Sequence, residues 1–526
     1  MKPPMEEGLL HPAGEAEEVD EAYPARHKVD TFGGLVEVEW EDEGAAGMHG
    51  GLVYFVEFLK VSVLWERFVE ECPLHYVSPN APTKSEILGT ILFSVLSGHR
   101  RYAHITGIRA DMVLPRLLGI ERFRSEDSIR RAFEKVDEEA LTLWMDRQMD
   151  QTFAPLLRYG WVLDLDTTVK TLYGHQEEAR VGYNPHKPGR PSHVYHAMLL
   201  TAARLVLNVD TEAGNLTASA YGMEGLWGWL DARHRDDWPT LIRGDIAYGN
   251  QEMMLGCETR ALPYLFKVRK SPGVATMLGK LARQRDGQVD WMPAGKGWEG
   301  VSQRIQLQGW TRERRVIVLR RKLPGTDSAV PEDMVQPTLP GLTLEYKSGD
   351  LYEHAVLVTN WAENNLLTVA QMYRDRADAE NIFDELKNQW GWRGFATQDL
   401  KRSRLMARMV ALIFNWWSIY TRMGSGPMHA EAISTRPLLQ QAVVRRSRHA
   451  NQTKLTLSSI HAKARLAAKL LNRISQWLAR FVRPAEQLEQ VQRWAAMVVQ
   501  LYREFGKFPL DGKPEALTLD PLNCRI

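Results

Sequence analysis

The stretch WVLDLDTTV, residues 161–169, marks the point at which a helical sequence pattern gives way to an α/β pattern. It is an apolar run of strand length, and further runs follow at residues 196–209, 240–248 and 262–269, the first of them long enough for a strand pair. Helical segments separate the last three runs. This alternation predicts an α/β layer built around a central sheet.

The charge is distributed unevenly along the chain, although the formal net charge of its 526 residues is only +1. The first 50 residues hold 13 Asp and Glu against 3 Lys and Arg, whereas residues 387–483 hold 18 Lys and Arg against Asp399 and Glu431 alone. A basic region with so few carboxylates is typical of a protein that binds a polyanion, so we expect nucleic acid there. A solvated basic helical surface is the alternative.

Simple patterns exclude several protein classes. Cys72, Cys257 and Cys524 lie far apart and form no CxxC pair, which argues against a disulfide scaffold or a zinc ribbon. The chain has no leader-like start and no uninterrupted apolar run of membrane-spanning length, so we expect a cytoplasmic protein without a membrane segment. The motifs GxxxxGK[ST], GxSxG and HExxH are absent, which leaves nucleotide-driven motors, serine hydrolases and zincins without support.

Acidic residues fall where α/β folds place their chemistry. Asp164 and Asp166 lie inside the first strand, Asp245 ends a later strand, and Glu380 lies on a helix further along the chain. Carboxylates of this kind can hold two Mg²⁺ ions, which cut phosphodiester bonds without a covalent enzyme intermediate. Each acid taken alone is also compatible with the end of a strand or the cap of a helix.

The helix expected over residues 373–387, YRDRADAENIFDELK, has an unusual polar face. At 100° per residue, Tyr373, Arg376, Glu380 and Lys387 share one narrow stripe beside the apolar one. Two readings remain open at this point. The stripe is either a surface with an ordinary Arg376/Glu380 pair four residues apart, or part of a site.

These residues resemble those of the DDE transposases of bacterial insertion sequences. The signature of that family, Tyr, Arg, Glu and Lys separated by two, three and six residues, is matched by the stripe in full. LDLDTT and RGDIAYGN resemble the stretches that carry the first and second aspartates of the family. The segment YGHQEEARVGYNPHKPGRPSH, residues 173–193, is most similar to the insertion-sequence 1380 branch. The resemblance covers roughly residues 90–425.

The resemblance implies a catalytic and metal-binding triad of Asp166, Asp245 and Glu380, with two Mg²⁺ ions that Mn²⁺ can replace. Asp164 points to the same strand face as Asp166 but lies some 6.5 to 7 Å away along the strand. This is too far for both carboxylates to bind the same pair of metal ions. The Asp directly before the Thr pair aligns with the first catalytic acid of the family. We therefore assign the ligand role to Asp166 and a supporting role, orienting a ligand or a basic side chain, to Asp164.

Basic side chains around the triad are expected to contact DNA. The resemblance implies that Arg376 grips a phosphate with its planar fork and that Lys387 acts as a point charge, while Tyr373 offers its hydroxyl. In the Pro-rich stretch YNPHKPGRPSH, Lys187 and Arg190 suit a stiff contact to the DNA backbone. A plain turn-rich connector explains that stretch equally well.

The expected fold is an α/β RNase H-like catalytic core with a β-rich insertion, flanked by all-α N-terminal and C-terminal domains. The segments are an acidic, loosely ordered arm (1–50), a helical DNA-binding domain (51–157), the first part of the core (158–270), the β-rich insertion with a hairpin around TRER (271–352), the closing helix of the core (353–395) and a basic helical C-terminal domain (396–526).

The resemblance implies a cut-and-paste DNA transposase of a bacterial cytoplasm. Its partners would be the terminal inverted repeats of a transposon and target DNA, held by a homodimer. Two alternatives remain. One is an RNase H-like nuclease or resolvase that only hydrolyses, which leaves Tyr373, Arg376 and Lys387 without a purpose. The other is a non-catalytic DNA-binding protein derived from a transposase, against which the intact acids argue.

Overall fold

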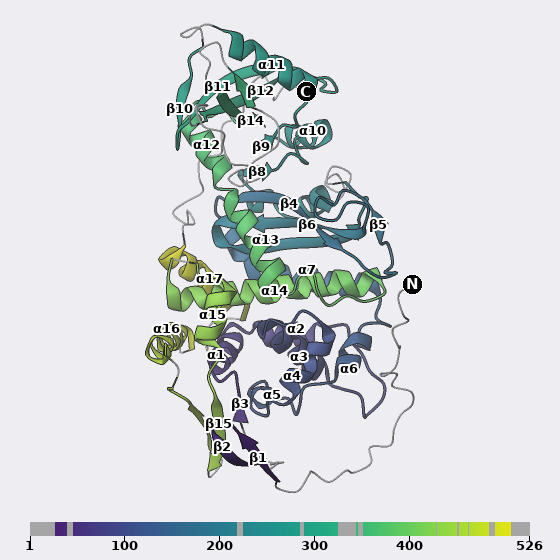
Figure 1. Ribbon diagram of the computed structural model, residues 1–526, viewed down its shortest axis with the longest axis vertical. Coiled ribbons are helices and arrows are strands. Elements are labelled where there is room, and N and C mark those ends of the chain that lie inside the picture. Colours follow the sequence, from purple (N-terminus) through teal and green to yellow (C-terminus); the bar gives the residue numbers. More distant parts are fainter. Residues whose placement is uncertain are drawn as a thin grey trace.

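A mixed sheet and a helical body make up the protein, and Figure 1 shows the sheet in the upper half and most of the helices below it. The computed structural model describes residues 27–38, 46–217, 225–284, 289–323, 343–345, 351–427, 429–449, 452–460, 462–482 and 490–506. Within this part of the chain, no helix is long and apolar enough to cross a membrane.

The centre of the sheet is formed by the strands that the apolar runs predict. In spatial order they are β7 (Leu205–Ala213), β6 (Pro191–Leu200), β4 (Val162–Thr171), β8 (Leu241–Gly244) and β9 (Tyr264–Lys267). β7, β6 and β4 are antiparallel neighbours, whereas β4, β8 and β9 run parallel. Parallel strands need crossover connections, and α9 (Trp227–Asp231) and α10 (Gln251–Thr259) lie in those connections.

The β-rich segment predicted at 271–352 continues the same sheet. Its strands join β9 through β14 (Leu351–Thr359), then β12 (Arg314–Lys322), β11 (Trp298–Ile305) and β10 (Met292–Gly295). β11 and β12 form the antiparallel hairpin expected around TRER. The segment also contains a helix, α11 (Pro272–Arg283). Small strands β5 (Arg180–Val181) and β13 (Thr343–Glu345) complete the sheet.

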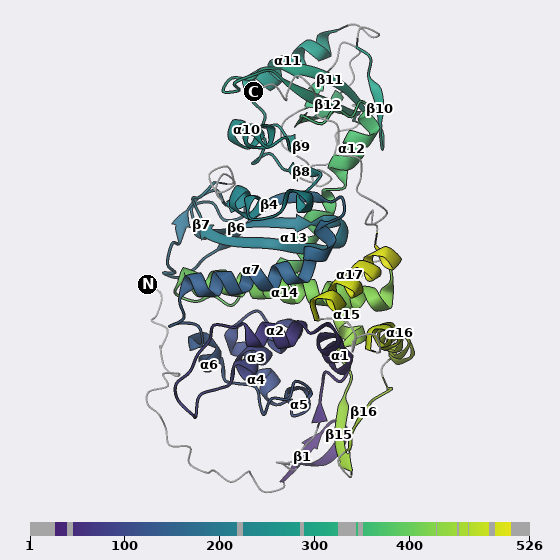
Figure 2. The same cartoon turned by 180° about the vertical axis from the view of Figure 1, so that it is seen from behind.

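The N-terminal and C-terminal helices share one core. The helices before the sheet are α1 (Leu52–Ser62), α2 (Leu64–Glu70), α3 (Lys84–Leu96), α4 (Ile105–Arg109), α5 (Leu114–Leu117), α6 (Glu126–Arg131) and α7 (Glu138–Leu157). Those after it are α14 (Leu400–Ser425), α15 (Ala432–Leu439), α16 (Ala464–Val482) and α17 (Gln490–Phe505). The long α7 and α14 lie side by side beneath the sheet in both views (Figures 1 and 2). Because most of α14 is buried, its apolar run is a core feature.

The prediction of an all-α C-terminal domain is wrong. Residues 444–457 form an antiparallel hairpin of β15 (Val444–His449) and β16 (Gln452–Leu457). The sequence prediction includes this Arg-rich stretch in a basic helical domain. The hairpin instead follows the period of two of a strand, with β-branched Val444, Thr453 and Thr456 in it.

Part of the acidic arm is also ordered, contrary to the prediction for residues 1–50. β1 (His27–Thr31) and β2 (Gly34–Val38) form a hairpin. β3 (Ala46–Gly47) pairs with β15, which ties the end of the arm to the C-terminal hairpin. The remainder of the arm lies outside the described residues.

The single helix expected over residues 373–387 is interrupted. α12 (Leu366–Arg374) ends before Asp375, and α13 (Ala377–Gln389) begins after Arg376. The two helices cover different parts of the sheet: α12 packs on β10 and β11, while α13 packs on β4. A continuous straight helix could not pack on both of these regions, because the sheet twists between them. No Gly or Pro marks the break in the sequence.

Candidate active site

A buried ion pair underlies the site. Asp164 on β4 and Arg243 on β8 are register neighbours. Arg243 Nη2 lies 2.6 Å from Asp164 Oδ2, and Nε lies 2.7 Å from Oδ1. Arg243 also donates to the carbonyl of Met372, near the end of α12. This bidentate contact therefore fixes two strands and one helix in place.

The next row of side chains lies at the carboxyl ends of the parallel strands. Continuing the register one residue beyond the last paired positions places Asp166, Asp245 and Lys267 side by side across β4, β8 and β9. Asp245 begins the connection after β8 and accepts a hydrogen bond of 2.9 Å from the backbone N–H of Ala247. Two predicted acids and one lysine thus share this edge.

The turn between α12 and α13 brings the third acid to the same place. Arg376 Nη2 lies 2.8 Å from Asp166 Oδ2, and Nη1 lies 3.6 Å from Glu380 Oε1. The Arg376 side chain is 7% exposed, whereas that of Glu380 is 70% exposed. Arg376 therefore joins an acid on the sheet to an acid on the helix, and Glu380 faces solvent.

The pKa of Asp166 is direct support for this convergence. Burial raises the pKa of Asp166 to about 6. The Arg376 guanidinium opposes this rise, and the charges of Asp245 and Glu380 add to it. Burial also raises the pKa of Tyr373 to about 12, again with contributions from all three acids. The three carboxylates therefore act on the same neighbours.

Two lysines complete the electrostatics. Burial, followed by the charge of Arg376, lowers the pKa of Lys267 to about 8, while Asp245 and Glu380 oppose the shift. Burial also lowers the pKa of Lys387, and Asp166 and Glu380 are among the charges that oppose this effect. Four predicted residues from the helical stripe, Tyr373, Arg376, Glu380 and Lys387, are thus close enough to the two aspartates to affect, or be affected by, their charges.

The predicted loop residues lie elsewhere. Lys187 and Arg190 are exposed in the connection between β5 and β6. The Arg190 guanidinium lies 5.8 Å from the centre of the Tyr173 ring, and the Lys187 backbone N–H donates to Asn184. Among the interactions of the described residues, none joins either side chain to the three acids.

Sequence reasoning missed three members of the site. Lys267 and Arg243 are basic residues within otherwise apolar strand runs, which is a usable signal because an unpaired charge is costly to bury. Tyr248 is 2% exposed, and burial together with Asp166 and Asp245 raises its pKa well above the usual value. Nothing in its sequence context distinguishes Tyr248 from an ordinary core residue.

Comparison with known protein families gives one match that covers most of the chain. Residues 44–479 match the model of the transposase DDE domain, group 1. The chain belongs to this family. The family uses divalent metal ions, and membership supports an enzyme that acts on DNA in transposition.

Other comparisons add little to the family assignment. No curated protein matches the chain. Among six matching chains of solved structures is the piggyBac transposase in a synaptic complex with hairpin DNA, with 12% identity, a TM-score of 0.37, and coverage of 90% of this chain and 89% of that one. A structural similarity at this level supports no conclusion about this DDE transposase.

The carboxylates of this DDE transposase fit a hard divalent cation by their chemistry. As the side chains stand, no three His, Cys, Asp or Glu residues of the described ranges are grouped closely enough to form a metal centre. Asp166, Asp245 and Glu380 nevertheless supply oxygen donors from three different elements, which is the ligand type that Mg²⁺ prefers. In the described part of the chain, Arg376 alone forms an ion pair with any of them. Arg376 thus pairs with Asp166 and Glu380, while Asp245 has no ion-pair partner among the described residues.

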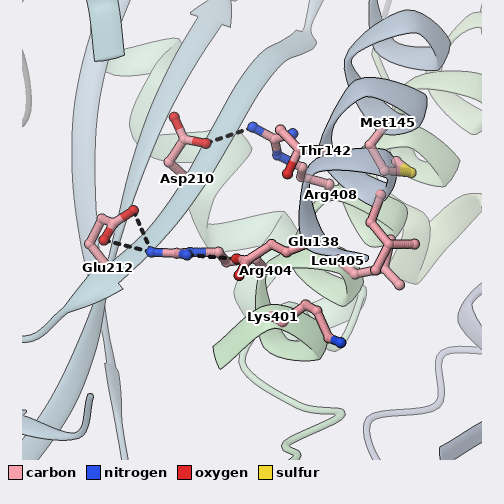
Figure 3. A pocket seen from close by; sticks show the side chains of 10 residues that line it. Glu138, Thr142, Met145, Asp210, Glu212, Lys401, Arg404, Leu405 and Arg408 are labelled. Atoms are coloured by element: carbon pink, nitrogen blue, oxygen red, sulfur yellow. Dashed lines mark hydrogen bonds and ion pairs between the residues drawn. The ribbon is translucent and has the colours of Figure 1, made fainter. Parts of the chain in front are cut away.

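A second acidic cluster lies in a pocket on the other face of the sheet (Figure 3). The pocket is lined by side chains of β7, α7 and α14. Arg404 contacts Glu138 at 2.7 Å and Glu212 at 2.9 Å, and Arg408 contacts Asp210 at 2.7 Å. Because arginines already pair these acids, we assign the pocket a structural role in joining the sheet to the helices.

Proposed function

We propose that the chain is a cut-and-paste DNA transposase of the insertion-sequence 1380 branch, with Asp166, Asp245 and Glu380 as its catalytic acids. The observation that carries this proposal is that Arg376 links Glu380, in the first turn of α13, to Asp166 at the sheet edge that also carries Asp245. Three antiparallel strands followed by two parallel ones, β7–β6–β4–β8–β9, support an RNase H-like core.

Two Mg²⁺ ions held by these acids, or Mn²⁺ in their place, would supply an activated oxygen nucleophile and stabilise the leaving oxygen. The side chains of the protein have separate tasks. Arg376 remains cationic because Asp166 and its other acidic neighbours raise its pKa despite its burial. With Lys387 and Lys267, it forms a cationic rim that positions a DNA phosphate. Tyr373 stays protonated at neutral pH and can donate its hydroxyl hydrogen.

The proposed reaction has two kinds of phosphoryl transfer. Water first attacks a phosphodiester at the transposon end; the bond from phosphorus to the 3′ oxygen breaks, and a 3′-OH is released. When that 3′-OH attacks the other strand, a hairpin forms; water then opens the hairpin and regenerates the 3′-OH, which attacks target DNA, and each transfer forms one bond for each bond broken. Two transposon ends held together would require two copies of the chain, so we propose a homodimer as the active assembly.

This function can be tested with purified protein and an oligonucleotide duplex that carries the inverted repeat flanking the gene. With Mg²⁺ and a target plasmid, we expect a nick at the repeat boundary and a covalently joined product. With EDTA, both products should be absent. Nicking without joining would identify a nuclease or resolvase, and binding without nicking would identify a non-catalytic DNA-binding protein.

A further inference from the structure

The basic hairpin β15–β16 projects from the helical body at the end far from β10 and β11 (Figures 1 and 2). Its base is held by two contacts: β3 pairs with Val444 and Arg445, and the backbone N–H of Gly50 donates to Ala442 at 2.9 Å. Beyond these positions, in the described part of the chain, the two strands pair only with each other. The outer part of the hairpin is therefore a ribbon two strands wide.

The two faces of this ribbon differ. One face carries fully buried Val444 and half-buried Leu455 and Leu457, which anchor the ribbon to the body, together with half-buried Arg446 and exposed Arg448 and Thr453. The opposite face, which we call the ribbon face, consists of three cross-strand pairs whose six side chains are all exposed. These pairs are Arg445 with Thr456, Ser447 with Lys454, and His449 with Gln452.

The chemistry of the ribbon face indicates its ligand. Every side chain on it can donate a hydrogen bond when His449 carries a proton on the outward nitrogen, and none is acidic or apolar. A protein partner would need apolar or aromatic anchors, which this face lacks. Hydrogen-bond donors and cations on a two-stranded ribbon match the acceptor-rich major groove of duplex DNA, which admits such a ribbon.

We infer that the ribbon face enters the major groove of the duplex beside the transposon end and reads base edges there. This inference rests on the proposed function, because it takes the bound duplex to be a transposon end. Arg445 and Lys454, from opposite strands of the ribbon, are the main donors to guanine, and Gln452 is a donor and acceptor suited to adenine.

The test uses the full-length protein and the end-containing duplex, with the double variant Arg445→Gln/Lys454→Gln. Wild-type protein should protect guanine N7 atoms in the major groove from dimethyl sulfate, and the variant should lose that protection. Affinity should fall about tenfold or more. If both side chains also screen phosphates, the slope of log K against log salt should flatten by up to about 1.8.

Matched controls separate this effect from charge and folding. Arg158→Gln/Lys280→Gln removes the same two charges from exposed positions on α7 and α11 and should leave the N7 protection unchanged. Lys454→Arg keeps the charge and should retain most of the affinity. If the double variant were unstable, the single variants Arg445→Gln and Lys454→Gln would each be expected to lose part of the protection.

Unchanged affinity and protection in the ribbon variant would overturn the inference, as would a wild-type protein that protects no N7 atoms. Its failure can be told apart from failure of the proposed function. A wild-type protein that cuts and joins DNA, with a ribbon variant that binds normally, refutes the ribbon alone. A wild-type protein that binds the end through the ribbon but never cuts refutes the catalytic proposal alone.

Discussion

The two faces of the sheet treat their carboxylates in opposite ways. Strand alternation and register send Asp210 and Glu212 of β7 to one face and Asp166 of β4 to the other. On the first face, Arg404 and Arg408 pair the acids of the pocket in Figure 3. On the second face, Asp166 and Glu380 share Arg376, and Asp245 has no ion-pair partner among the described residues.

The acids of the pocket face hold the sheet and the helices together, whereas we propose that the acids of the second face bind a cation. A carboxylate that is partly buried beside other carboxylates resists ionisation, and the raised pKa of Asp166 records that resistance. Such a cluster costs stability and persists where function requires it. A divalent cation would neutralise it, whereas each acid on the other face already lies in an ion pair with Arg404 or Arg408.

The largest effect should come from removing one charge of the acidic cluster around Arg376. Glu380→Gln and Asp166→Asn keep the size of the side chain but lose a ligand charge, so DNA cleavage should fall by roughly three orders of magnitude or more, as for residues that act as one catalytic unit. Binding of the end duplex should remain. The matched change on the paired face, Glu212→Gln, should alter the cleavage rate far less.

These variants are compared by single-turnover cleavage of a labelled end duplex in Mg²⁺. Near-normal cutting by Glu380→Gln or Asp166→Asn would remove that residue from the proposed triad. Loss of cleavage in Glu212→Gln, with its fold intact, would show that the acids of the pocket face also take part in cleavage.

Asp164 and Asp166 allow the same comparison within a single strand, because they lie two residues apart on the same face. Its bidentate pair with Arg243 is almost fully buried. Asp164→Asn leaves that guanidinium without its counter-ion, so the free energy of unfolding should drop by about 3–5 kcal/mol. Urea unfolding measures this loss. A variant as stable as wild type would mean that Arg243 does not depend on Asp164.

The sequence could predict the chemistry of the site better than its geometry. The strands of the core, the acids and the stripe residues follow from local apolar runs and residue spacing. The α12–α13 break could not be predicted, because it depends on how two helices fit a twisted sheet. The identity of the basic partner of Asp164 could not be predicted either, since Arg243 lies 79 residues away in the chain.

The β15–β16 hairpin shows a second limit. An Arg-rich segment without strong apolar periodicity is compatible with a helix or a strand when taken alone. The pairing of β15 with β3, from the other end of the chain, helps to decide between them. Such long-range pairing leaves no local signal in the sequence.

The face that carries Asp210 contains a group whose pH response tests the comparison. Burial lowers the pKa of His196 from 6.5 to about 4, and the side chain is 2% exposed. Between these two values, the unfolded chain binds a proton that the folded chain does not. Stability is therefore complete above pH 6.5 and is lost as the pH falls toward 4, by up to about 3 kcal/mol.

His196→Gln removes this titrating group. The difference in unfolding free energy between wild type and variant, measured in urea at pH 7.5, 5.5 and 4.5, isolates the histidine from the carboxylates that both proteins share. The wild-type protein should lose more stability over this interval than the variant. Parallel pH curves would show that His196 is not held neutral in the fold.

The smallest expected effect concerns Arg376, the cation that pairs with Asp166 and Glu380. Arg376→Gln leaves Asp166 and Glu380 without their ion-pair partner beside Asp245 at pH 8, so the mutual repulsion of the three acids should lower stability by about 1–2 kcal/mol. A divalent cation relieves that repulsion, and a ligand that binds only the folded state stabilises it by mass action. The rise in melting temperature on adding Mg²⁺ should thus be larger for Arg376→Gln than for wild type. In the double variant Arg376→Gln/Glu380→Gln, one of the repelling charges is gone, and the extra response to Mg²⁺ should shrink. Equal responses in all three proteins would mean that Arg376 and the metal do not compensate the same charges.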